Sequence, residues 1–222
     1  MARKESFEDI IKRKPYPPVI KNFINLTRAG HPRIKQTMGI LAEQDINPKD
    51  FETYCKAFAD GLQYVYILHN TLPQQILLDD DPTYTARYSE SFDHDTLALQ
   101  HNRITLSRVG LADLIKTHQY TRISKLGFPQ ICARPCDYIR LAGIEEGLHC
   151  WQLSSSSSSD SYKYNAMYST ESHASDRNID PRVYASAPVE CDIEWRLLEA
   201  MDRIAADNLR KTRPKSPPGR LA

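Results

Sequence analysis

Two cysteines four positions apart, followed later by an adjacent His-Cys pair, are the residues here whose types best suit a metal ion. Cys132 and Cys136 form the first pair, and His149 and Cys150 form the second. Zinc prefers tetrahedral sets of thiolate and imidazole ligands, and such sets often begin with a close cysteine pair. The second pair is adjacent in sequence, however, and Pro135 stiffens the first. Because ordinary buried thiols explain the same residues, we expect no metal and no cofactor, with these four as the candidates should zinc bind.

A second constellation with chemical capacity consists of His69 and the pair His94-Asp95. It resembles the spaced histidine and His-Asp ligands of helical metal-dependent phosphohydrolases. The resemblance covers three residues, and it implies a metal-dependent hydrolase in which they hold the ion. Against this alternative, the chain lacks a nucleophile elbow, a phosphate-binding glycine loop, an HExxH helix and an EF-hand loop. With eight glycines in 222 residues, it is also poor in tight turns, and we expect a protein that is not an enzyme.

A basic segment offers a nucleic-acid alternative. Residues 97–140 hold seven basic and two acidic side chains, whereas residues 43–95 hold eleven acidic and three basic ones. Within the basic segment, residues 111–126 have the rhythm of a helix-turn-helix with its turn at 117–120. The second helix of such a motif contacts phosphates and base edges; its contact residues here are Thr121, Arg122, Ser124 and Lys125. Two packed helices with a solvated basic face explain the same pattern.

These residues must be positioned by a surrounding fold, and its organising element is the stretch from Asn47 to Asn70. Asn47 suits the N-cap, Pro48 suits the first helical position, and Asp50 favours the first turn. Apolar side chains then recur at steps of three and four, which indicates one helical face. After Gly61 the polar face disappears, so residues 62–68 are either the buried half of one long helix or a buried strand. We predict one helix, since an interior glycine costs only about 1 kcal/mol.

The remaining body is predicted to be mainly helical. Residues 17–26, 33–44, 91–102, 111–118 and 121–126 have helical patterns, and 76–78 suggests a single turn. Short strands around 103–109 and 130–153 would make the fold α+β, although a helix around 138–142 fits equally. Residues 1–16 are polar and basic, and we expect them to be flexible. The predicted fold class is therefore mainly α, possibly α+β, with a helical body at 17–153.

The composition changes abruptly after the body. Residues 154–187 begin with a serine run and contain little aliphatic side chain, so we predict a disordered linker. Residues 188–211 follow as an amphipathic helix, and residues 212–222 form a basic, proline-rich tail. An apolar stripe on a tethered helix must be covered, either by its own body or by a partner. The residues expected to bind a partner are Ile193, Trp195, Leu197, Leu198, Met201 and Ile204.

The sequence thus favours a non-enzymatic adaptor or accessory subunit of a larger assembly. Five cysteines, an odd number, and the absence of a signal peptide or a membrane-spanning run indicate a reducing cytoplasm. We expect a protein partner within a multi-subunit, bacterial complex, for example a secretion or coupling machinery, and no membrane insertion. DNA binding and metal-dependent hydrolysis are the alternatives.

Overall fold

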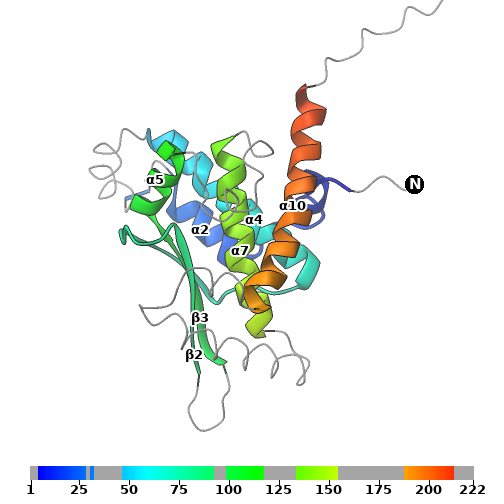
Figure 1. Cartoon of the computed structure of the whole chain (residues 1–222). Helices are drawn as coiled ribbons and strands as arrows, with labels where there is room; N and C mark the ends of the chain where they lie inside the picture. The colour runs from blue at the N-terminus through cyan, green and yellow to red at the C-terminus, as the bar shows by residue number, and fades with distance from the viewer. Residues whose placement is uncertain are drawn as a thin grey trace, which may run out of the picture.

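The computed structural model describes residues 5–28, 31–32, 47–92, 99–117, 134–154 and 188–212. In this part of the chain, helices predominate and a small sheet lies along one side of them (Figure 1). The helices are α1 (Phe7–Ile11), α2 (Pro18–Leu26), α4 (Pro48–His69), α5 (Arg108–Thr117), α7 (Pro135–Ser154) and α10 (Pro188–Thr212). The strands are β1 (Gln75–Asp79), β2 (Ala86–Phe92) and β3 (Leu99–Ser107). The helix-rich character expected from the sequence is confirmed. The helices predicted at 33–44 and 121–126, the linker and the basic tail lie outside the described residues.

Helix α4 is continuous from Pro48 to His69, as predicted. The Asn47 side chain accepts the Lys49 N–H at 2.9 Å, which caps the first turn. At the other end Asn70 adopts a left-handed conformation, φ 53°, and its N–H bonds to the Tyr66 carbonyl. Gly61 does not end the helix. Its missing Cβ instead lets a neighbouring helix approach, because a Cβ there would collide with the Arg140 carbonyl.

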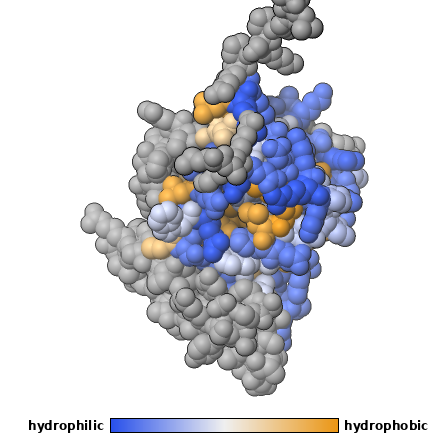
Figure 2. Space-filling model, turned by 90° about the vertical axis from the view of Figure 1, so that its right-hand side faces the viewer, coloured by the Kyte–Doolittle hydropathy of each residue, from blue (hydrophilic) through white to orange (hydrophobic). Residues whose placement is uncertain are grey.

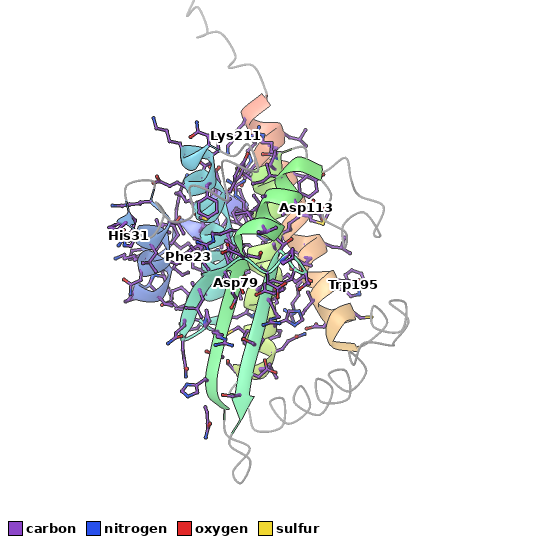
Figure 3. The ribbon with its side chains drawn as sticks, turned by 90° about the vertical axis from the view of Figure 1, so that its left-hand side faces the viewer. Phe23, His31, Asp79, Asp113, Trp195 and Lys211 are labelled. Carbon is purple, nitrogen blue, oxygen red and sulfur yellow. The ribbon has the colours of Figure 1, made fainter. Side chains whose placement is uncertain are left out.

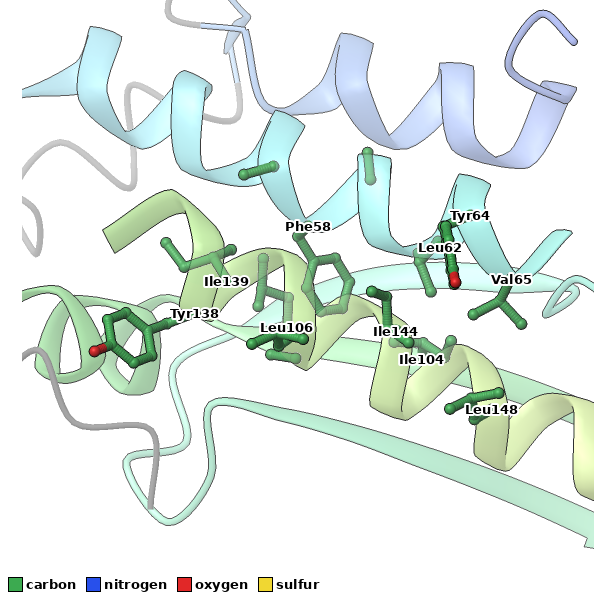
Figure 4. Close-up of a cluster of buried hydrophobic side chains, with 14 of the residues drawn as sticks. Phe58, Leu62, Tyr64, Val65, Ile104, Leu106, Tyr138, Ile139, Ile144 and Leu148 are labelled. Atoms are coloured by element: carbon green, nitrogen blue, oxygen red, sulfur yellow. The ribbon is translucent and has the colours of Figure 1, made fainter. Parts of the chain in front are cut away.

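That neighbouring helix is α7. It replaces the short strands expected within 130–153 and contains 138–142, where a helix was the alternative. It is buried on nearly all sides, so its polar and apolar residues show no helical period, and the sequence pattern there was misleading. Gly143 mirrors Gly61 from the α7 side, since a Cβ at Gly143 would collide with the Phe58 carbonyl. The two helices therefore pack backbone against backbone, with Phe58, Leu62, Ile139 and Ile144 filling the core around the crossing (Figure 4).

The sheet has the strand order β1-β3-β2, with β1 parallel and β2 antiparallel to the central β3. Asn102, Ile104 and Leu106 are buried on the face toward α7. The strand expected near 103–109 is present as the second half of β3. The helix predicted at 91–102 is wrong, because β2 runs to Phe92 and β3 begins at Leu99. The single turn predicted at 76–78 is also wrong: Ile76 belongs to β1, where the parallel pairing with β3 buries it.

The N-terminal stretch 1–16, which was expected to be flexible, contains a short helix in its described part. From Glu5 onward it contains α1, whose N-cap Ser6 accepts the Asp9 N–H at 3.1 Å. Phe7 and Ile10 are buried, and the Phe7 ring stacks on Tyr64 of α4 with centroids 5.2 Å apart. Helix α10 lies across α7 and α1 (Figure 1). The first and last described helices therefore both cover the central pair.

Candidate protein-interaction surface

The inner side of α10 belongs to the core of this chain. Ile193, Leu197, Met201 and Ile204, four of the six residues expected to bind a partner, are each at most 2% exposed. Spacings of three and four place them on one helical face, which packs on α7 and α1. Burial of side chains of this size stabilises the fold by about 1.5–3 kcal/mol each. These four residues are therefore covered by the chain itself, and they present no surface to a partner in this structure.

A three-layer stack fixes the first half of α10 to the ends of α4 and α7. The Arg196 guanidinium lies over the Trp151 ring, 4.2 Å from its centroid, and the His69 ring packs on that same Trp151 at 4.4 Å. Asp192 accepts from Arg196 at 3.2 Å and from the Gln152 amide at 3.4 Å. Burial and the nearby Arg196 charge lower the pKa of His69, because both disfavour the imidazolium. At neutral pH, His69 is thus a neutral aromatic partner in the stack.

Polar contacts with the N-terminal segment and with α7 fix the second half of α10. Arg203 donates to the Glu5 carbonyl at 2.8 Å, and Lys211 forms an ion pair with Glu8. Asn208 donates to the buried carboxylate of Asp137 at 2.8 Å. These contacts and the Arg196 stack hold both halves of α10 against the body. The side chains on its outer side are therefore carried by a helix that is fixed in place.

The outer side of α10 carries a second apolar row. Trp195 is 76% exposed and Leu209 is 66% exposed, while Leu198 is half-buried and Cys191 is exposed. Positions 191, 195, 198 and 209 share one helical face, because 4, 3 and 11 residues are each close to whole turns of 3.6 residues. We call Cys191, Trp195, Leu198 and Leu209 the outer row. Trp195 points away from the body in Figure 3.

The face that carries α10 is mixed in polarity. Figure 2 shows apolar side chains gathered between hydrophilic ones on this side of the molecule. Leu68, on the last turn of α4, is 41% exposed. Leu68 directly precedes His69 in the chain and Trp195 directly precedes Arg196, so each adjoins one member of the His69–Trp151–Arg196 stack. Large aromatic side chains left in water beside such a support are typical of interface anchors.

Sequence reasoning found Trp195 and Leu198 but missed Leu209 and Cys191. The sequence contains the signal, because steps of 4, 3 and 11 residues connect the outer row. It was missed because α10 was treated as having a single apolar stripe. A helix with two apolar rows, one covered and one exposed, requires that each row be followed separately.

The metal candidates do not form one site among the described residues. Cys136 begins α7, whereas His149 and Cys150 lie near its end, and a rise of 1.5 Å per residue separates them by about 20 Å. No group of three His, Cys, Asp or Glu side chains in the described ranges could hold a metal ion. Cys150 is buried, which raises the pKa of its thiol to about 12 and makes it a poor ligand. Cys132 lies outside the described residues.

The other two alternatives rest largely on residues that the structure does not describe. His94 and Asp95 of the hydrolase constellation lie outside it, while His69 occupies the aromatic stack. The first helix of the helix-turn-helix prediction corresponds to α5, and Thr121, Arg122, Ser124 and Lys125 follow beyond the described part. Neither alternative therefore gains a supporting contact.

Comparison of the chain with models of protein families, with curated proteins and with solved structures finds no match. Among the described residues, no helix is both long and apolar enough to cross a membrane.

Proposed function

We propose that this protein is a non-enzymatic adaptor or accessory subunit that binds a protein partner through the outer row of α10, with Trp195 as the anchor. The observation that carries this proposal is the 76% exposure of Trp195 on a helix whose opposite side is fully buried. A tryptophan side chain contributes about 150–250 Å² to an interface when it is covered. Trp is also among the residues that most often dominate binding energy.

The firm attachment of α10 to the body of the protein favours the proposal. The Arg196 guanidinium contacts the Trp151 ring and forms an ion pair with Asp192, so two contacts fix the residue next to Trp195. A partner that covers Trp195 would pay little ordering entropy for the helix itself, because α10 is already folded on the body. Leu198 and Leu209 extend the contact along the helix.

The setting in this proposal is a multi-subunit cytoplasmic assembly, such as a bacterial secretion or coupling complex. Its basis is compositional: opposite charges lie in separate segments of the sequence, and the catalytic motifs described above are missing from it. DNA binding through 111–126 and metal-dependent hydrolysis through His69, His94 and Asp95 stay alternatives.

The test is site-specific photo-crosslinking in the native cell. A photoreactive phenylalanine analogue replaces Trp195 in the full chain, and the same analogue at Leu77 is the control. Leu77 is 39% exposed on β1, so it samples the surroundings of a different surface. We expect a discrete crosslinked protein from position 195 that is absent at position 77. The proposal fails if both positions give the same products, or if Trp195→Ala leaves retention of the crosslinked protein unchanged.

A further inference from the structure

The outer face of the sheet, turned away from α7, is polar and positively charged at one end. Side chains alternate between the faces of a strand, and the register pairs Gln75 and Ser89 with Arg103, and Ser91 with His101. These five side chains therefore share the outer face. All are exposed except Ser89, which is half-buried. They come from all three strands, so the strand pairing fixes their relative positions.

A cavity of about 260 Å³ lies at this end of the sheet. Every lining residue is polar or charged: Gln74, Gln75, Ser89, Glu90, Ser91, His101, Asn102 and Arg103. The volume is slightly below the range of drug-sized ligand pockets. A small polar ligand suits this space, because every lining residue carries a polar or charged side chain.

Arg103 is oriented for recognition of an anion. Its Nε donates to the Ser89 hydroxyl at 3.1 Å across the β2–β3 pair. Among the described residues no other hydrogen bond to Arg103 occurs, and this one uses Nε rather than the terminal nitrogens of the guanidinium. A guanidinium held in one orientation presents paired N–H donors that match the oxygens of a phosphate or carboxylate.

The one acidic residue among those that line the cavity belongs to the other face of the sheet. Glu90 is paired with Asn102, and alternation places both on the face toward α7. Asn102 donates to Cys150 of α7 at 3.7 Å and to Ser154 at 3.4 Å, which fixes that assignment. Asp79 does share the outer face, but it is four residues from Gln75, roughly 13 Å along β1. There it accepts the Tyr84 hydroxyl.

We propose that this cavity binds a small phosphomonoester, with Arg103 and His101 holding the phosphate and Ser89, Ser91 and Gln75 donating to its oxygens or to the attached group. Charge complementarity selects the anion, and the fork of Arg103 favours a tetrahedral oxyanion that accepts two parallel hydrogen bonds. The cavity volume restricts the ligand to a small molecule. The site lies on the sheet, so it is independent of the interaction surface on α10.

The test is calorimetric titration of the full chain with glycerol 3-phosphate, with glycerol and inorganic phosphate as separate probes. We expect both phosphates to bind, glycerol 3-phosphate more tightly than inorganic phosphate, and no binding of glycerol. Arg103→Gln should weaken the affinity about tenfold or more, because it removes charge-assisted hydrogen bonds. Arg87→Gln is the matched control. Arg87 is also exposed on the outer face of β2, but its guanidinium lies 4.8 Å from the centroid of the Tyr84 ring and it does not line the cavity.

Unchanged melting temperatures in both variants would show that any loss is local. The proposal is overturned if neither phosphate binds at low ionic strength. It is also overturned if Arg87→Gln weakens binding as much as Arg103→Gln, because a diffuse positive field would then explain the result. Binding of inorganic phosphate without preference for the ester would restrict the site to the free anion and contradict the ligand class proposed.

Discussion

The carboxylate of Asp207 accepts the backbone N–H of Glu8 at 2.9 Å, which joins the last described helix to the first across 199 positions of sequence. Glu8 is in the first turn of α1, where backbone N–H groups lack helical partners and a negative charge is favoured. The Glu8 carboxylate in turn pairs with Lys211, which lowers the pKa of Glu8. Asp207 of α10 therefore satisfies a backbone N–H of α1, and Glu8 of α1 in turn pairs with the Lys211 ammonium of α10.

Replacement of Asp207 should loosen this junction. Asp207→Ala leaves the Glu8 N–H without its acceptor, and we expect the free energy of unfolding to fall by about 1–3 kcal/mol. Urea denaturation followed by circular dichroism measures the change. Asp202→Ala on the same helix is the control, since Asp202 is exposed and should stay within about 0.5 kcal/mol of wild type. Equal effects of the two variants would contradict the assigned contact.

Truncation should destabilise the fold strongly in the inner row of α10 and hardly at all in its outer row. Leu197 is fully buried, so Leu197→Ala should cost about 2–5 kcal/mol of stability. Trp195→Ala removes a larger side chain, yet we expect a change within about 0.5 kcal/mol because most of that side chain is in water. Thermal unfolding of both variants makes the comparison. Substantial destabilisation by Trp195→Ala would mean that the outer row is covered by the chain itself.

The crossing of α4 and α7 should tolerate a methyl group at one glycine and not at two others. Gly61→Ala and Gly143→Ala place a Cβ against a backbone carbonyl of the other helix, so the helices must separate, at a cost of about 1–3 kcal/mol. Gly147→Ala meets the Val65 side chain at 3.0 Å, which a small shift relieves. The helix propensity of alanine is about 1 kcal/mol more favourable than that of glycine, and this gain offsets the strain. Denaturant midpoints should therefore rank Gly147→Ala clearly above the other two variants.

Glu90 should make stability depend on pH. Burial raises the pKa of Glu90 from 4.5 to about 7, and its Oε2 has no hydrogen-bond partner among the described residues. The folded state therefore holds a proton that the unfolded state releases above pH 4.5, so stability falls as the pH rises from about 4.5 to 7. Glu90→Gln removes this loss. We expect it to stabilise by about 1–2 kcal/mol at pH 8, after allowance for partial solvent exposure.

The pH profile of unfolding checks this expectation. The difference between Glu90→Gln and wild type should shrink toward zero at pH 4, where the carboxyl is protonated in both states. A difference that does not vary with pH would show that the substitution acts through packing rather than ionisation.

The elements that the sequence predicted well are those with one covered face and clear ends. Helix α4 has a side-chain cap at Asn47, and α10 has an apolar period on its inner side, so local chemistry and burial agree. Helix α7 could not be predicted in this way. It is enclosed by α4, α10, α5 and the sheet, and a helix covered on all sides has no polar face to give a period.

The strands were obscured for a related reason. In β2 and β3 the outward positions carry Ser, Arg and His, and apolar residues alternate with them over only a few positions, so a helical pattern fitted 91–102 as well.

Of the two candidate sites, one could be found from the sequence and the other could not. Trp195 stood out by its residue type, whereas the cavity around Arg103 depends on the pairing of β1 with β3. No spacing along the chain reveals which side chains a parallel pair brings together.

The position of α10 over α7 also has a consequence for synthesis on the ribosome. The surface of α7 that accepts Ile193, Leu197 and Met201 is complete once Ser154 has been translated, but its cover arrives only with Pro188–Thr212. At roughly 5–20 residues per second, this apolar surface stays open for several seconds in each nascent chain. Transiently exposed apolar surface of this kind makes a folding chain prone to aggregate until its cover is in place.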